Sequence, residues 1–327
     1  MKVLVTGGTG FTGKALVKRL LSESHEVVVL DNKEGLKTSE IRNWGAEVYI
    51  GSVTDQSLVK KCVKGIEVIH HLAAAFREMN VPDSYYEEVN VGGTRNLLEA
   101  AIEAKVQKFI YCSTCGVHGN IDRPPGDEEA PIKPADYYQR TKYMAEPIVK
   151  EYCQKGLPAV ILRPAAIYGP GDPERFFMIF KRVAKGYFPI FGNGKTYYHP
   201  LYIDNLIDAF MLSMQKAKGK GEAYLIADDD YLEIEELVRK VAKALNTEIQ
   251  IPHFPIAPLV AAGHICEKLC KPFHIKPPIF PRRVDWYRQN RAFKIDKAKK
   301  ELGYKPAIDI DEGLKRTAEW YKREGYL

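Results

Sequence analysis

Short apolar runs alternate with stretches in which apolar residues recur at helical spacing. Runs typical of buried strands lie at 2–6, 26–31, 47–50, 66–70, 107–112 and 158–163, and helical patterns lie near 13–23, 56–63, 86–104, 138–154 and 173–185. Such alternation predicts an α/β fold, with a doubly wound parallel sheet and right-handed crossovers. Ligands of these sheets bind beyond the carboxyl ends of the strands.

A glycine-rich loop joins the first predicted strand to the first helix. Its sequence, Gly7-Gly8-Thr9-Gly10-Phe11-Thr12-Gly13, fits GxGxxG from Gly8 and GxxGxxG from Gly7. Glycines at these positions permit a tight turn, close approach of the backbone to a pyrophosphate, and close packing of helix on strand. A lone GxGxxG is often an ordinary glycine turn. The place of this one between strand and helix favours a dinucleotide site.

An acidic residue ends the second predicted strand. Asp31 lies about twenty residues beyond the loop, where a carboxylate accepts hydrogen bonds from the adenine-ribose hydroxyls. A carboxylate there repels a 2′-phosphate, so the sequence favours NAD over NADP. Lys33 could pair with such a phosphate, but the position is also typical of a solvated turn lysine.

Tyr138 and Lys142 are four residues apart on a predicted helix and therefore share one face. A phenol titrates near pH ~10, and an adjacent ammonium lowers that pKa toward neutrality. Thr114 follows the strand at 107–112, and its hydroxyl could hold a substrate oxygen while Tyr138 transfers the proton. Alone, a Tyr/Lys pair is often a solvated helix face. Together with the glycine loop, it indicates proton transfer coupled to dinucleotide chemistry.

In motif order, the chain resembles the extended short-chain dehydrogenases/reductases, which include sugar-nucleotide epimerases, 3β-hydroxysteroid dehydrogenases and dihydroflavonol reductases. The matching segments are TGGTGFTG at 6–13, Asp31-Asn32, HLAA at 71–74, NVGGT at 90–94, Ser113-Thr114, Tyr138/Lys142, RPAAIYGPG at 163–171, HPLYID at 199–204 and KAKKELGY at 297–304. The resemblance covers essentially the whole chain.

The resemblance implies an NAD-binding Rossmann domain at 1–164, with a return segment near 200–228. It implies a smaller α/β substrate domain at 165–199 and 229–327, and a homodimer paired through the helices near 86–104 and 138–154. Catalysis is assigned to Tyr138 as general acid/base, Lys142 on the tyrosine and nicotinamide ribose, and Thr114 on the substrate. The residues expected to contact the cofactor are Gly7, Gly10, Phe11, Thr12, Gly13, Asp31, Asn32, Leu72, Ala73, Ala74, Asn90, Ser113, Tyr138, Lys142, Pro164 and Ile167.

Composition narrows the remaining classes. The 327 residues include six scattered cysteines, typical of reduced thiols rather than a disulfide framework. No apolar run approaches a membrane span and the N-terminus reads as a strand, so we expect a cytoplasmic protein. Cys112 and Cys115 form a CxxC, but it overlaps the Ser-Thr stretch, which makes redox chemistry a poor interpretation.

A second group of residues has the types of metal ligands, namely His264, Cys266, Cys270 and His274. Cys266 and Cys270 share a helix face, whereas His264 points elsewhere and Pro272 breaks the helix before His274. We therefore predict no metal site and expect structural, buried cysteines in this apolar stretch.

The charge of the chain is uneven. Residues 271–300 hold ten Lys/Arg against two acids, and the rest holds 38 against 40, so this segment accounts for the whole net charge of +6. The segment could bind an anionic substrate or surface, or it could be a solvated basic face. No groove-reading motif accompanies it, which argues against nucleic acid as a partner.

Three departures from the family pattern bear on the substrate. Cys115-Gly116 stands where dehydratases carry Asp-Glu, Ala166 replaces an Asn, and Tyr198 replaces an Arg that suits a diphosphate. These departures favour an NAD-dependent oxidoreductase acting on a small-molecule alcohol or ketone without a diphosphate. An NAD-dependent nucleotide-sugar epimerase is the alternative, supported by the basic segment. A non-catalytic NAD-binding scaffold is the third, disfavoured by the intact Thr114/Tyr138/Lys142 set.

Overall fold

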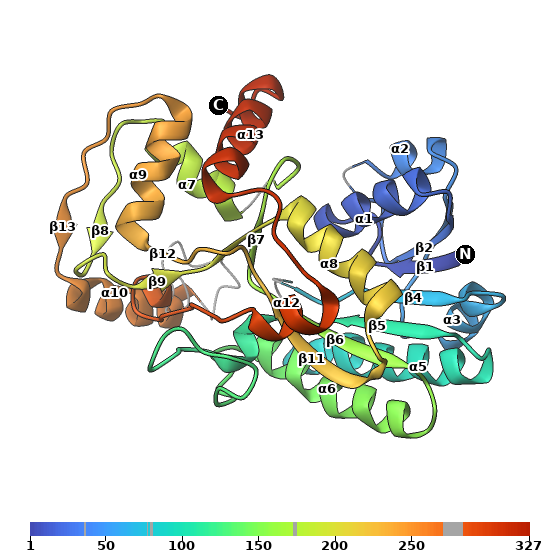
Figure 1. Ribbon diagram of the computed structural model, residues 1–327. Coiled ribbons are helices and arrows are strands. Elements are labelled where there is room, and N and C mark those ends of the chain that lie inside the picture. The colour runs from blue at the N-terminus through green and yellow to red at the C-terminus, as the bar shows by residue number, and fades with distance from the viewer. Residues whose placement is uncertain (36, 77, 79–80, 173–174, 271–283) are drawn as a thin grey trace.

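The computed structural model describes all residues except 36, 77, 79–80, 173–174 and 271–283. A seven-stranded parallel sheet forms the larger part of the molecule, in the order β11-β6-β5-β4-β1-β2-β3 (Figure 1). The strands are β1 (Lys2–Thr6), β2 (Glu26–Asp31), β3 (Glu47–Ile50), β4 (Val68–His71), β5 (Lys108–Cys112), β6 (Ala159–Pro164) and β11 (Lys220–Ile226). The predicted doubly wound α/β fold is confirmed.

Helices cover both faces of the sheet (Figure 1). One face carries α1 (Phe11–Ser22), α2 (Thr38–Asn43) and α8 (Ile203–Lys216), and the other carries α3 (Gln56–Val63), α5 (Gly93–Glu103) and α6 (Tyr137–Gln154). A hydrophobic core lies on each face of the sheet. Along β1, Val3 and Val5 belong to the core on one face, and Leu4 belongs to the core on the other. Strands buried on both faces read as continuous apolar runs, which is the pattern in the sequence.

The six predicted strands are all present, but three predicted elements differ in detail. β4 covers 68–71 rather than 66–70. The helix predicted at 86–104 is three consecutive segments, α4 (Asp83–Glu87), the π-helical turn η1 (Glu88–Gly92) and α5. Within the segment predicted at 173–185, α7 covers Arg175–Val183. The sequence places residues 200–228 in the first domain but does not predict the strand β11 within them. The register of β11 against β6 shifts between Lys220 and Ala223.

The remaining elements form the left half of Figure 1 and the connections back to the sheet. They comprise the helices α9 (Ile234–Leu245), α10 (Ile256–Cys270), α12 (Asp296–Leu302) and α13 (Ile310–Arg323), the short helices η2 (Cys115–His118) and η4 (Asp285–Tyr287), and the short strands β7 (Ala166–Tyr168), β8 (Ile190–Phe191), β9 (Tyr197–Tyr198), β10 (Pro200–Tyr202), β12 (Leu232–Glu233) and β13 (His253–Phe254). The predicted division into two domains stays a prediction.

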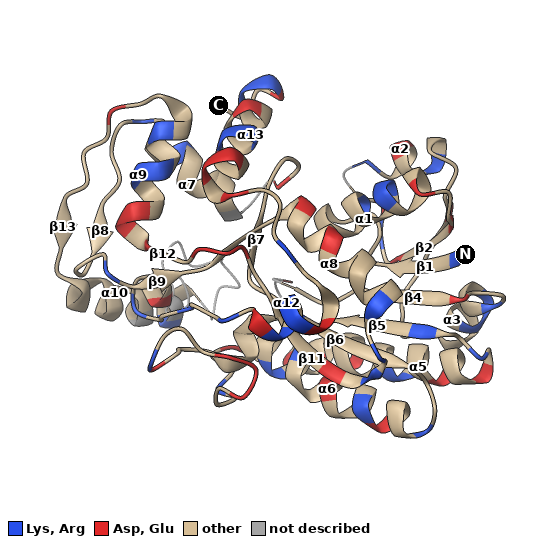
Figure 2. Ribbon diagram, viewed as in Figure 1, with Lys and Arg blue, Asp and Glu red and all other residues tan. Residues whose placement is uncertain are grey.

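Acidic and basic residues are interspersed along the helices in both halves of the molecule (Figure 2). Two lysines of the basic segment have local partners: Lys299 lies 2.6 Å from Asp229, and Lys297 donates to the Ala223 carbonyl at 2.9 Å. Residues 271–283, including Arg282 and Arg283, lie outside the described residues. Within the described part of the chain, no helix has the length and apolarity to cross a membrane.

Candidate active site

The glycine loop packs too tightly for side chains at three of its positions, and at Gly8 a Cβ would lie 2.7 Å from the Val29 side chain. A Cβ at Gly13 would lie 2.1 Å from the Gly7 carbonyl oxygen, and one at Gly7 would lie 2.8 Å from the Ala73 nitrogen. Gly7 also adopts a φ of +72°, which favours glycine. Gly10 is exposed and caps α1 without a side-chain acceptor for the first N–H groups. This arrangement fits a pyrophosphate at the helix N-terminus.

Asp31 stands beside this loop at the end of β2. Its Oδ2 accepts from the backbone N and the hydroxyl of Thr9, at 2.9 and 2.7 Å, and its Oδ1 accepts from the Asn32 nitrogen at 2.9 Å. The carboxylate is therefore fixed at the place expected for a ribose acceptor. The Lys33 side chain is 70% exposed and lies 3.5 Å from the Glu78 carboxylate, in agreement with a solvated turn lysine.

A buried histidine holds the end of β4 against the loop. His71 Nδ1 accepts from the Thr6 hydroxyl at 2.7 Å, while its Nε2 donates to Thr94 Oγ1 at 2.9 Å because the Thr94 hydroxyl itself donates to the Asn90 carbonyl. Burial lowers the pKa of His71 well below its usual value, so the ring is neutral. It orients the stretch of Leu72, Ala73 and Ala74. The sequence motif includes His71 but gives it no role.

Asn90 ties the same stretch to the catalytic helix. Its amide oxygen accepts from Ala75 N at 2.7 Å, and its nitrogen donates to Ala75 O at 3.2 Å and to Thr141 Oγ1 at 2.9 Å. It lies in the π-helical turn, a feature common at functional sites. The structure therefore shows Asn90 supporting the site, and its contact with NAD stays a prediction.

Tyr138 and Lys142 lie on α6, which begins with Asp136 as its N-cap. Lys142 is 1% exposed, and its ammonium nitrogen lies 4.2 Å from the centre of the Tyr111 ring, a cation–π contact. Burial lowers the pKa of Lys142 to about 8, so it remains largely protonated at neutral pH. The half-buried Tyr138 ring packs on Phe76, with ring centres 4.7 Å apart.

Ser113 and Thr114 lie just beyond the carboxyl end of β5. Thr114 is half-buried, and its oxygen accepts from Gly116 N at 3.1 Å, which leaves the hydroxyl hydrogen able to donate. The buried Ser113 hydroxyl instead donates to Glu146 at 2.6 Å. Pro164 ends β6, and the half-buried Ile167 lies in β7. The cofactor contacts predicted for Ser113, Pro164 and Ile167 stay predictions.

The cysteine arrangements do not form sites among the described residues. Burial raises the pKa of the Cys112 thiol to about 11, which disfavours the reactive thiolate. The sulfurs of Cys266 and Cys270 are 4.0 Å apart, but both residues are half-buried, so the expectation of buried cysteines there is wrong. α10 is a helix with an exposed side, not a core element. His274 lies outside the described residues, and the described residues hold no metal-binding group of three.

Comparison with known proteins identifies the family. Residues 3–227 match the model of the NAD dependent epimerase/dehydratase family. The chain belongs to this family. The residues described above fit its cofactor, NAD, and the chain is an enzyme of the extended short-chain dehydrogenase/reductase type.

Relatives include both branches that the sequence leaves open. The chain is 31% identical to 3beta-hydroxysteroid-dehydrogenase/decarboxylase isoform 1 of Arabidopsis thaliana, over 97% of this chain and 78% of the relative. It is 32% identical to a Mycobacterium tuberculosis 3 beta-hydroxysteroid dehydrogenase/Delta 5-->4-isomerase, over 98% and 90%. A UDP-glucose 4-epimerase of Thermotoga maritima, solved with UDP-glucose, is 26% identical, with a TM-score of 0.79 over 99% of both chains.

The position of Asp31 leads to a test of cofactor choice. We expect NAD to bind at least about tenfold tighter than NADP, or about 1.4 kcal/mol, because the 2′-phosphate would meet a carboxylate fixed by Thr9. Calorimetric titration of both nucleotides measures the ratio. Asp31→Asn should reduce the ratio of the NAD affinity to the NADP affinity. The matched control is Glu34→Gln, which changes an exposed acid nearby. Equal affinities in the unaltered protein would show that Asp31 does not face the 2′ position.

Proposed function

We propose that this protein is an NAD-dependent dehydrogenase that oxidises a secondary alcohol on a bulky, apolar substrate, or reduces the corresponding ketone. The observation that carries this proposal is the surface beside the catalytic tyrosine. Phe76 is 39% exposed and packs against Tyr138, so a large apolar side chain borders the phenol. Apolar area left exposed next to a reacting group favours an apolar ligand.

Three side chains share the chemistry. Bound NAD supplies the hydride acceptor. Tyr138 takes the hydroxyl proton as the substrate carbon loses hydride, so the products are a ketone, NADH and one proton. Lys142 favours the tyrosinate through its charge, and Thr114 donates to the substrate oxygen. The buried ammonium suits this role because its electrostatic effect is screened little by water.

Three positions depart from the family pattern, namely Cys115-Gly116, Ala166 and Tyr198. The residues around them argue against a diphosphate substrate and against a dehydratase mechanism. A Cβ at Gly116 would lie 3.0 Å from the side chain of Gln139, so an acidic side chain there would displace Gln139. Tyr198 is buried among aromatic rings, 6.0 Å from Trp286 and 6.1 Å from Phe176 between ring centres. Ala166 is also buried. A diphosphate would therefore lack the partners that offset its desolvation.

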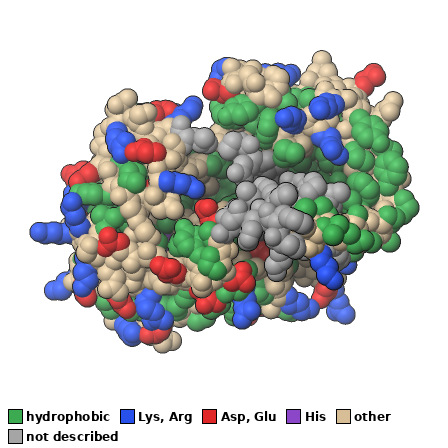
Figure 3. Space-filling view, turned by 180° about the vertical axis from the view of Figure 1, so that it is seen from behind, with side chains coloured by type: hydrophobic (Ala, Val, Ile, Leu, Met, Phe, Trp, Pro, Cys, Tyr) green, Lys and Arg blue, Asp and Glu red, His purple; other side chains and the backbone are tan. Residues whose placement is uncertain are grey.

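Further apolar surface lies at the end of the molecule away from the N-terminus (Figure 1). Seen from behind, hydrophobic side chains gather at the end that carries β8, β13 and α10 (Figure 3). Phe254, Ile265 and Leu269 of these elements are exposed. The apolar stretch around Cys266 and Cys270 is therefore not simply part of the core. Its exposed side chains could contact an apolar substrate.

The alternative is an NAD-dependent nucleotide-sugar epimerase, in which the sugar is oxidised transiently and the cofactor is regenerated. The likeness to the UDP-glucose 4-epimerase over nearly the whole chain favours it. A non-catalytic scaffold is the third possibility. A scaffold has no need to bury Lys142 beside Tyr138, since burying a charge is costly. We also propose that the protein is cytoplasmic and pairs as a homodimer through α5 and α6.

Removing the phenol tests the chemistry. We expect Tyr138→Phe to lower the rate of hydride transfer about 10²–10⁴-fold with NAD affinity nearly unchanged, because only the proton acceptor is lost. Tyr137→Phe, one residue away and bonded to Glu87, is the control and should keep its rate. Lys142→Met should weaken both turnover and NAD binding. Near wild-type turnover of Tyr138→Phe on an identified substrate would refute the assignment.

A substrate screen separates the two branches. We expect calorimetry to find no micromolar binding of UDP- or GDP-sugars, because Ala166 and Tyr198 offer the diphosphate no charged partner. We expect NADH absorbance to appear with a member of a 3β-hydroxysteroid and sterol panel, chosen from the names of the relatives. Micromolar binding of a nucleotide sugar, with epimerised product and no net NADH, would establish the alternative.

A further inference from the structure

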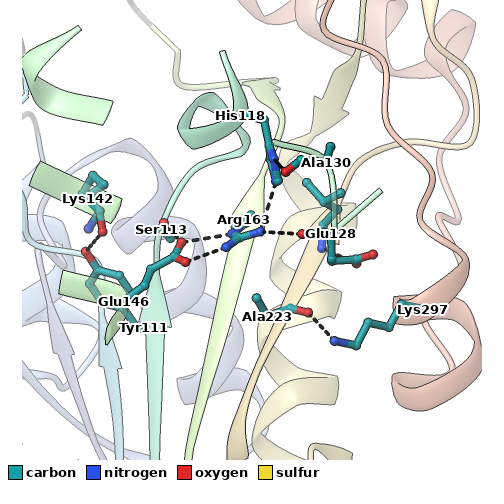
Figure 4. Close-up of polar contacts among 11 residues, drawn as sticks. Tyr111, Ser113, His118, Glu128, Ala130, Lys142, Glu146, Arg163, Ala223 and Lys297 are labelled. Carbon is teal, nitrogen blue, oxygen red and sulfur yellow. Dashed lines mark hydrogen bonds and ion pairs between the residues drawn. The ribbon is translucent and has the colours of Figure 1, made fainter. Parts of the chain in front are cut away.

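A buried ion pair joins α6 to β6 (Figure 4). Glu146 and Arg163 form two hydrogen bonds, Nη2 to Oε2 at 2.6 Å and Nε to Oε1 at 3.0 Å. Their side chains are 1% and 5% exposed. Ser113 donates a third hydrogen bond to the same carboxylate at 2.6 Å. This two-pronged geometry fixes the orientation of Glu146, which a single contact would not do.

The ion pair is continued on the other side by a neutral histidine (Figure 4). His118 Nδ1 donates to the Ala130 carbonyl at 2.9 Å, so its Nε2 accepts from Arg163 Nη1 at 3.1 Å. Burial, and then the nearby Arg163, lowers the pKa of His118. The same Nη1 donates to the Glu128 carbonyl at 3.3 Å. Arg163 therefore has partners from α6, η2 and the loop that follows η2.

Glu146 also stands in line with the catalytic pair. Tyr138, Lys142 and Glu146 occupy positions i, i+4 and i+8 of α6 and share one face of the helix. Ser113, which bonds Glu146, is the neighbour in sequence of Thr114. One carboxylate thus connects the face that carries Tyr138 and Lys142 to the strand end that carries the substrate hydroxyl donor.

We propose that Glu146, held by Arg163, is a positioning residue that sets the catalytic face of α6 against the end of β5 and compensates the buried charge of Lys142. The inference rests on the proposed roles of Tyr138, Lys142 and Thr114. Glu146 itself touches no reacting atom. It acts through the helix register and through its charge.

The charge on Lys142 depends on a small set of neighbours. The titratable groups around it are Tyr138 and Glu146 on α6, Tyr111 and Cys112 on β5, and His71 on β4. Burial lowers the pKa of Lys142, and Cys112 and Glu146 oppose that effect. Cys112 holds its proton at neutral pH, because burial raises the pKa of its thiol. Glu146 is therefore the one carboxylate among these neighbours.

The test uses the full-length protein with Glu146→Gln. Loss of the carboxylate should lower the titration midpoint of Lys142, followed by ¹³Cε-lysine NMR and assigned with Lys142→Arg, by about half a pH unit or more. The midpoint moves to lower pH because Lys142 loses a nearby negative charge and therefore releases its proton more easily. The alkaline limb of the activity profile should move the same way, and kcat should fall about tenfold or more through misplacement.

Two further variants keep the test decisive. Glu146→Gln leaves Arg163 buried without a counter-ion, so Glu146→Gln/Arg163→Gln serves if the single variant does not fold. In the double variant we expect the same fall in kcat and a smaller downward shift of the Lys142 midpoint, because the lost arginine charge acts in the opposite direction. Glu151→Gln, which removes an exposed partner of Lys155 on the same helix, is the matched control and should change neither quantity. A folded Glu146 variant with a wild-type Lys142 midpoint and wild-type kcat would overturn the proposal.

The Tyr138→Phe and Glu146 variants together show whether the proposed function or the role of Glu146 is wrong. If Tyr138→Phe retains its turnover, the proposed function fails, whatever Lys142 does. If Tyr138→Phe is inactive and the Glu146 variants behave as wild type, the proposed function stands and Glu146 serves only the fold.

Discussion

The buried ammonium of Lys142 is the constraint around which the site is arranged. Moving a charge out of water costs several kcal/mol even after the protein relaxes, and the cost must be offset by fixed partners. Here the partners are the face of the Tyr111 ring and the carboxylate of Glu146, one helical turn away. The carboxylate is buried too and requires Arg163, which requires His118. One buried charge is thus linked to a chain of buried polar residues.

The same chain explains how distant parts of the sequence meet at one sheet edge. β5 and β6 are adjacent and parallel, so Ser113 and Arg163 emerge at the same end of the sheet. α6 crosses between these strands in the sequence and returns Glu146 to them. Removing one member of such a buried pair costs about 3–5 kcal/mol, because the other charge remains without a partner. Fold and site therefore share these residues, and a change there affects both.

The sequence predicts the elements whose signals are local. The strand-like run of β1, the glycines of the loop and the Tyr/Lys spacing depend on neighbours in the chain, and the structure has each where it was expected. The sequence does not predict β11, because Lys220, Gly221 and Glu222 leave this strand a continuous apolar run only at 223–226. The partners of Arg163 come from residues 17 to 45 positions away, and no periodicity indicates them. Only the spacing of Glu146 from Lys142 offered a signal.

The residues that distinguish a dehydrogenase from an epimerase in this family lie outside the face of α6 that carries Tyr138 and Lys142. A dehydrogenase and an epimerase both need a proton acceptor, a nearby cation and a bound hydride acceptor, so Tyr138 and Lys142 do not distinguish them. The difference lies in whether the walls of the site offer charge to a diphosphate or apolar area to a hydrocarbon. Tyr198 lies inside an aromatic cluster and Phe76 is exposed beside the phenol. The exposed ring of Phe76 lowers the cost of placing an apolar substrate next to Tyr138, and Tyr198 provides no cation to offset the desolvation of a phosphate.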